Sequence, residues 1–140
     1  MEIEKAIDSM KRAYNLEKYL YGEKSAKSIE TINNLAIMHY SLDEKAQAKE
    51  FFEKAMKLKE EFWGEKHPNI IATLEPLAMI YDDFGDYENA KLMYERIYDI
   101  SKSYYKENDP ETLRIKSEIE ELEKKRIIKL FDGLPKFLMV

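Results

Sequence analysis

The sequence contains no cysteine among its 140 residues. That absence excludes disulfide bonds, zinc sites built on thiolates and cysteine nucleophiles, and it fits a protein of a reducing compartment, so we expect a cytoplasmic location. No stretch approaches the roughly 20 apolar residues of a membrane-spanning helix, and the start of the chain is charged and amphipathic, unlike a signal peptide. We therefore expect no insertion into a membrane.

Histidine and glycine are scarce, with two and four copies. His39 and His67 belong to no metal-binding motif, and the sequence has no glycine-rich phosphate loop and no nucleophile elbow. We expect His39 to be a packed, hydrogen-bonded side chain and His67 to cap a helix. The sequence therefore predicts no catalytic residue, no metal site and no cofactor, and it does not indicate an enzyme.

A surplus of basic residues is also missing, because the formal net charge is -5 and the isoelectric point is near 5.2. Binding to a phosphate backbone needs a strongly basic face, and no such stripe is present, so a nucleic-acid partner is not expected. The 28 acidic residues are spread along amphipathic segments, which is typical of solvated faces. We assign no acid/base pair.

The chain instead contains an internal repeat with an offset of 42 residues. Its clearest copy, residues 73–100, has apolar residues at helical spacing on both sides of Gly85, a residue that permits a sharp turn. The matching pairs are Gly22 with Gly64, Thr31 with Thr73, Leu35 with Leu77, Ala36 with Ala78, and Ala48 with Ala90. Two similar helical hairpins are therefore expected.

The second copy resembles the tetratricopeptide repeat family in its order of large, small and aromatic residues. The residues that carry this likeness are Leu74, Leu77, Ala78, Tyr81, Gly85, Tyr87, Ala90, Tyr94 and Ile97. The first copy matches less well, since Asp43 stands in place of the turn glycine and His39 and Lys45 replace the two tyrosines. The repeat exceeds the usual length of about 34 residues, and the linkers YGEKS and WGEKHPN are similar to those of kinesin light chain-type repeats.

The resemblance implies an all-α fold, a right-handed solenoid of antiparallel helix pairs with about six helices. We expect one domain over residues 1–131, followed by an apolar tail over residues 132–140. Its parts are an N-terminal helix at 1–20, repeats at 25–62 and 67–104, and a capping helix at 109–131. The first helix corresponds to the second helix of a repeat, and it is either a cap or the start of a segment from a longer array.

Local signals predict where helices begin and bend. Ser25 and Asp43 are placed to cap the helices that follow them. Pro76 falls inside a predicted helix, where proline removes a hydrogen bond and clashes with the carbonyl of Ala72 at a cost of roughly 3 kcal/mol. We expect a kink between Ala72 and Pro76.

The resemblance also implies a binding groove, because the first helix of each repeat in this family lines a concave surface that takes a peptide. The corresponding residues are Asn33, Ile37, Tyr40, Glu75, Met79, Asp82, Arg114, Ser117 and Glu121. Asn33 would bind a peptide backbone, Ile37, Tyr40 and Met79 would hold apolar anchors, and the acidic residues would attract lysine or arginine. The alternative is that these are ordinary surface residues.

The apolar tail suggests a second function. Together with the last two residues of the capping helix, its large side chains are Leu130, Phe131, Leu134, Phe137, Leu138 and Met139. They either dock on another copy, giving a homo-oligomer, or fold back over the last helix of their own chain. We favour a scaffold that binds a protein or peptide partner with basic and apolar residues, and we keep a self-associating assembly module as the alternative.

Overall fold

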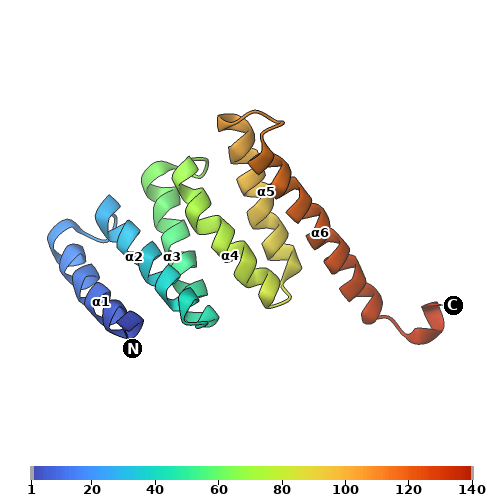
Figure 1. Cartoon of the computed structure of the whole chain (residues 1–140), viewed down its shortest axis with the longest axis horizontal. Coiled ribbons are helices and arrows are strands. Elements are labelled where there is room, and N and C mark those ends of the chain that lie inside the picture. Colours follow the sequence, from blue (N-terminus) through green and yellow to red (C-terminus); the bar gives the residue numbers. More distant parts are fainter. Residues whose placement is uncertain (1, 140) are drawn as a thin grey trace. The chain divides into compact units, whose positions relative to one another are not determined.

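The computed structural model describes residues 2–139. This part of the chain forms six α-helices, two short 3-10 helices and no β-strand (Figure 1). The all-α prediction is therefore confirmed. The elements are α1 (Glu2–Tyr21), α2 (Ala26–Ser41), α3 (Lys45–Trp63), η1 (Pro68–Ile70), α4 (Ile71–Asp83), α5 (Tyr87–Tyr104), α6 (Pro110–Asp132) and η2 (Lys136–Met139).

The chain divides into two compact units, Met1–Leu77 and Ala78–Val140, and the division falls inside α4. The outer limits of the four expected segments lie within two residues of those in the structure, but the second repeat begins with the 3-10 helix η1 and α4 itself begins only at Ile71. The expectation that residues 1–131 form one domain stays a prediction. Within residues 2–139, none of the helices is both long and apolar enough to cross a lipid bilayer.

In the first unit, α2 packs against both α1 and α3. Ile29 and Ile32 of α2 form a buried cluster with Ala55 and Leu58 of α3, and Tyr14 of α1 packs on its edge. The helical spacing of these residues places them on facing sides of the helices. Full burial of a side chain such as isoleucine stabilises a fold by about 1.5–3 kcal/mol, so this cluster contributes several kcal/mol of hydrophobic burial to the first unit.

His39 lies at the edge of the α2–α3 contact and is buried. Its ring stacks on Phe51 with centroids 5.2 Å apart, and its Nδ1 lies 3.0 Å from Oε2 of Glu44. The prediction of a packed, hydrogen-bonded histidine is confirmed. Of the two adjacent phenylalanines in α3, Phe52 is fully buried and Phe51 provides this stacking surface.

The predicted cap at Ser25 is confirmed, because its side-chain oxygen accepts a hydrogen bond from the backbone N–H of Ser28 at 3.2 Å. The predicted cap at Asp43 is wrong. Glu44 directly precedes α3, and Asp43 has φ 59°, in the left-handed region. Gly85, 42 residues later, has φ 75° in the same place of the second hairpin, so Asp43 substitutes for the turn glycine.

His67 caps the segment that leads into α4. Its Nδ1 accepts a hydrogen bond from the N–H of Asn69 at 3.1 Å, and Pro68 then begins η1. Proline suits the first helical position because the donor that it lacks would be unpaired there. Pro76 lies inside α4 as expected, and the kink at this residue stays a prediction.

Lys59 is a buried charge that the amphipathic pattern of α3 does not predict. Its side chain is 1% exposed, and Nζ donates a hydrogen bond to the carbonyl oxygen of Asn69 at 3.1 Å. Burial lowers the pKa of Lys59, and the nearby charge of Glu30 acts in the opposite direction. The ammonium group therefore ties α3 to the linker ahead of α4.

In the second unit, α5 packs along α6. The buried side chains of these two helices include Ala90, Tyr94, Ile97, Ile100, Ile115 and Leu122. Helical spacing places Ile115, Ile119 and Leu122 on one side of α6, and of these Ile115 and Leu122 are buried and Ile119 is partly buried. Across the helix pair, Glu123 of α6 lies 3.1 Å from Nζ of Lys91, and Arg126 adds a contact of 2.7 Å to the same carboxylate.

The Glu123 carboxylate is strongly stabilised in its charged form. Hydrogen bonds from Arg126 and then Lys91 lower the pKa of Glu123 to about 2. In the family pattern an aromatic residue occupies the position of Glu123. In this chain an ion pair takes the place of apolar packing at this position of α6. The Lys91–Glu123 pair adds a polar contact to the apolar packing between α5 and α6.

Candidate functional site

The predicted binding residues of the first unit lie on α2 and on the first part of α4. Ile37 is 45% exposed, and Tyr40 and Glu75 are partly buried. Asn33 is only 4% exposed, and its Oδ1 accepts a hydrogen bond from the Thr73 hydroxyl at 2.6 Å. Asn33 therefore joins α2 to α4 and offers little surface, and its contact with a peptide backbone stays a prediction.

In the second unit, the predicted residues at the end of α4 are Met79 and Asp82. Met79 is 43% exposed. Both carboxylate oxygens of Asp82 accept hydrogen bonds from Nζ of Lys125, each at 3.0 Å, and this contact raises the pKa of Lys125. Lys125 of α6 thus pairs with a residue of α4, although Glu121 lies one turn away from it on α6 itself. The negative charge of Asp82 is thus balanced within the chain.

The predicted residues of α6 are all exposed and all have partners one turn away. Arg114 donates to Glu111 at 2.9 Å, the Ser117 hydroxyl donates to the Leu113 carbonyl, and Glu121 accepts from Lys124. Exposed pairs of this kind contribute at most about 1 kcal/mol. These side chains can therefore exchange their local partners for those of a bound protein at small cost.

Two of the predicted residues occupy equivalent positions in the two copies of the repeat. Ile37 and Met79 are 42 residues apart, lie on α2 and α4, and expose 45% and 43% of their surface. The next position in this series is Glu121 of α6. Each unit therefore presents one large apolar side chain from the first helix of a hairpin.

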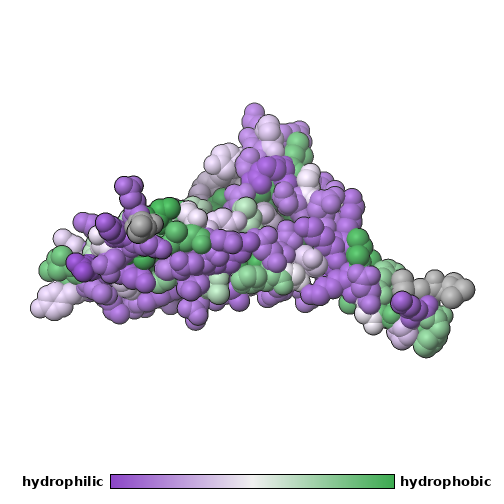
Figure 2. Space-filling view, turned by 60° about the horizontal axis from the view of Figure 1, so that its bottom comes forward, coloured by the Kyte–Doolittle hydropathy of each residue, from purple (hydrophilic) through white to green (hydrophobic). Residues whose placement is uncertain are grey.

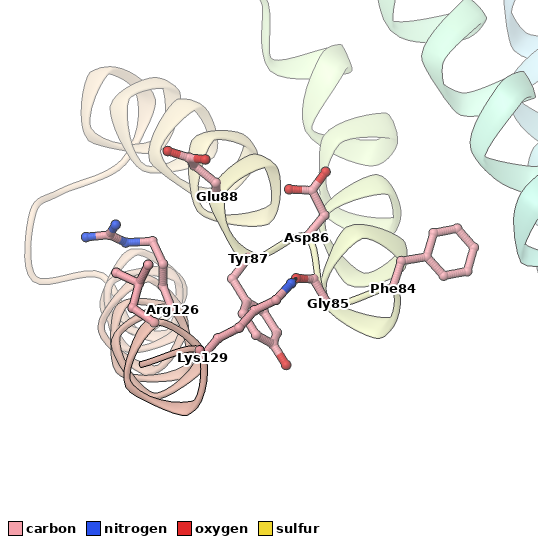
Figure 3. Close-up of a pocket in the computed structure, with 9 residues that line it drawn as sticks. Phe84, Gly85, Asp86, Tyr87, Glu88, Arg126 and Lys129 are labelled. Carbon is pink, nitrogen blue, oxygen red and sulfur yellow. Dashed lines mark hydrogen bonds between the residues drawn. The ribbon is translucent and has the colours of Figure 1, made fainter. Parts of the chain in front are cut away.

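The second unit also contains a hollow of about 710 Å³ that sequence reasoning did not identify (Figure 3). Phe84, Gly85 and Tyr87 line it on one side, and Lys129 and Leu130 of α6 line it on the other. Figure 3 shows the Lys129 side chain crossing to Gly85, whose carbonyl oxygen accepts its hydrogen bond at 2.8 Å.

The hollow depends on a contact between residues that are far apart in the sequence. The turn at Gly85 could be predicted, but Lys129 lies 44 positions later and no motif connects the two. The Lys129 ammonium also lies 5.6 Å from the ring centroid of Tyr87. The lining mixes aromatic, aliphatic and charged groups, which suits contact with a protein surface. Among the described residues, no cluster of histidine and acidic side chains is arranged to hold a metal ion.

The apolar residues of the tail are exposed. The exposed fractions are 51% for Phe131, 43% for Leu134, 77% for Phe137 and 61% for Leu138, and the side chain of Met139 lies outside the described residues. Figure 2 shows this apolar surface where α6 and η2 end. The tail therefore does not bury these four side chains over α6, and its role in self-association stays a prediction.

Comparison with known families agrees with the repeat. Residues 28–69 and residues 77–109 each match a family model described as tetratricopeptide repeat. The two matches correspond to the two copies found 42 residues apart in the sequence. Among the curated proteins, no match is found.

Solved structures of the same fold are also found. One is a Podosopora anserina structure described as putative kinesin light chain nearly identical TPR-like repeats. It superposes with a TM-score of 0.76 at 15% identity, over 89% of this chain and 59% of that one. BtubC (BKLC) from P. vanneervenii superposes with a TM-score of 0.70 at 19% identity, over 96% of this chain and 59% of that one. The chain therefore spans about three fifths of these structures.

Proposed function

Because the chain belongs to the tetratricopeptide repeat family, we propose that it binds a segment of another protein along the first helices of its hairpins. Repeats of this family support a scaffold for protein–protein interaction. The solved structures are at most 19% identical and share the fold, so their names do not identify the partner of this chain. The partner has to be inferred from the residues.

The paired exposure of Ile37 and Met79 carries the proposal. The surrounding positions of α2 and α4 follow the amphipathic rule, with apolar side chains such as Leu35 and Leu77 fully buried. Ile37 and Met79 are exceptions to this rule at the same position of the repeat. Their exposure favours a role as contact sites for apolar anchor residues of a partner. Tyr40 adds an aromatic surface one turn from Ile37.

Charge sets the second property of the proposed partner. The chain has a formal net charge of -5, which attracts a basic segment at long range. Asp82 already interacts with Lys125, so a lysine or arginine of the partner would share or replace that contact. We therefore propose a partner segment with two apolar anchors and basic residues between or beside them.

The proposal is tested with peptides selected from a display library on the intact chain. Ile37→Ser and Met79→Ser, combined, should weaken the selected peptides at least about tenfold, because each lost apolar contact contributes about 1 kcal/mol or more. Binding is measured by fluorescence anisotropy, and helix content and thermal unfolding are followed by circular dichroism.

The matched control is Leu92→Ser on α5, since Leu92 is exposed to a similar extent, 49%, on the second helix of a hairpin. This variant should keep full affinity. An equal loss in both variants, or no loss in the double variant, would reject the anchor role of Ile37 and Met79.

Self-association is the second candidate function, favoured by the exposed apolar residues from Ile127 to Leu138. It does not compete with the first proposal for its anchors. We propose no enzymatic activity and no cofactor, and the cytoplasmic location stays a prediction.

A further inference from the structure

The last two turns of α6 have an unusual distribution of side chains. Their cations face the second unit itself, since Lys125 contacts Asp82 and Lys129 donates to the Gly85 carbonyl. Ile127, Ile128 and Phe131 are 42%, 59% and 51% exposed. These polar contacts fix the rotation of α6, so the apolar side of this segment points away from the unit.

The outward side of α6 continues along the whole helix as one stripe, which we call the α6 stripe. Its residues are Leu113, Ser117, Glu120, Lys124, Ile127 and Phe131, all exposed. Their spacing alternates between four and three residues, which is the spacing of core positions in a coiled coil. The buried Ile115 and Leu122 lie on the opposite side, toward α5.

The α6 stripe is complementary to itself only when two copies run in opposite directions. With the midpoint at the level of Leu122, Glu120 of each copy faces Lys124 of the other. Leu113 then faces Phe131, and Ser117 faces Ile127. A parallel pair in register would place Glu120 on Glu120 and Lys124 on Lys124, and like charges at facing positions are repulsive.

We propose that α6 is a homodimer interface in which two copies of the chain pack their α6 stripes antiparallel about a two-fold axis. The partner of the α6 stripe is a second copy of the chain, because an antiparallel pair places opposite charges at its centre and apolar residues at its ends. A parallel pair in register does not place opposite charges together. The central Glu120–Lys124 pairs set the direction and register, and the apolar ends supply the burial. In the isolated chain Lys124 pairs with Glu121, an exposed contact that exchanges at small cost.

A charge exchange tests the interface on the intact chain. Glu120→Lys and Lys124→Glu, made singly, should each raise the dimer dissociation constant at least about tenfold, because like charges then face each other. The double variant restores opposite charges and should return to within about threefold of the original value. Sedimentation equilibrium gives the constants, and circular dichroism reports folding.

The matched control is Glu50→Lys, the same charge change at an exposed position of α3. It should leave the dissociation constant unchanged. A chain that is monomeric at all concentrations up to about 1 mM, or a double variant as weak as the singles, would overturn the proposal.

Because the chain has no cysteine, single introduced cysteines report the direction of packing. A mixture of Ser117→Cys and Ile127→Cys should form a mixed disulfide under mild oxidation, since these positions face each other across the axis. Ile127→Cys alone should not, because ten residues of helix separate the two copies of position 127 by about 15 Å. A disulfide from Ile127→Cys alone would indicate a parallel pair and reject the antiparallel model.

The dimer test is independent of the peptide test. The combined Ile37→Ser and Met79→Ser variant alters neither the charges nor the apolar ends of the α6 stripe. It should dimerise like the parent chain, so the failure of one proposal does not imply the failure of the other.

Discussion

At the scale of single residues, Lys59 is buried and its ammonium group donates a hydrogen bond to the carbonyl of Asn69. The pKa of Lys59 is lowered in the folded state. At pH values between the folded and the unfolded pKa, the unfolded chain therefore binds more protons than the folded chain. The free energy of unfolding rises with pH over this range. Lys59→Met removes this dependence on pH. When the pH is raised from 7 to 10, the free energy of unfolding of the parent chain should therefore increase relative to that of the variant.

Urea unfolding at the two pH values measures this difference. Lys57→Met, at an exposed position of the same helix, is the control and should show no such shift. A pH-independent difference between the parent chain and Lys59→Met would mean that the ammonium group is fully hydrated in the folded chain.

The two hairpin turns give a second prediction at this scale. Asp43 and Gly85 both have left-handed backbone, and their N–H groups donate to Tyr40 and Asp82, which are also 42 residues apart. Asp43→Gly should stabilise the chain by up to about 1 kcal/mol, and Gly85→Ala should destabilise it by about 1 kcal/mol.

Chemical unfolding of both variants measures these effects. A Cβ at Gly85 would have Lys129 Nζ as its nearest neighbour at 3.7 Å, so the expected cost comes from the backbone conformation. A stable Gly85→Ala variant would show that this turn can adopt another conformation.

At the scale of helices, the ion pair between α5 and α6 makes their contact sensitive to acid. The pKa of Glu123 is lowered to about 2 from an ordinary value of 4.5, so its contribution is complete above pH 4.5 and is lost as the pH falls toward 2. Glu123→Gln should lower the melting temperature at pH 6, and the difference from the parent chain should become much smaller at pH 2.

Circular dichroism melts at the two pH values test this prediction. Glu121→Gln is the control, because Glu121 pairs with Lys124 of its own helix and this pair does not join α6 to α5. An equal difference between parent and Glu123→Gln at both pH values would show that the carboxylate acts through packing and not through charge.

For the whole molecule, the tail and the α6 stripe predict different outcomes of truncation. Removing Pro135–Val140 takes away Phe137 and Leu138, which are 77% and 61% exposed and so contribute little burial. The shortened chain should keep its dimer and should melt within about 2 °C of the parent. Loss of the dimer in solution would place the self-contact in the tail instead of α6.

Much of the architecture could be predicted from local patterns. The repeat offset, the turn at Gly85, the caps at Ser25 and His67 and the burial of Leu35 and Leu77 depend on helical periodicity and turn chemistry, which short stretches of sequence contain. For Asp43 the sequence predicts a helix cap, whereas the structure has a left-handed turn residue there, as at the aligned Gly85. An aspartate can either cap a helix with its carboxylate or adopt a left-handed backbone conformation in a turn. The residue type alone does not distinguish these two roles.

The sequence by itself determined that this chain forms helical hairpins of the tetratricopeptide kind, because hydrophobic spacing and turn residues act over one or two turns of helix. Only the tertiary structure decided which polar groups meet: Asn33 with Thr73, Lys59 with Asn69, Asp82 with Lys125 and Lys129 with Gly85. These partners are 10 to 44 residues apart, and pairing at that range depends on how the helices pack rather than on any local pattern. The same packing set the rotation of α6, and with it the surface that α6 presents.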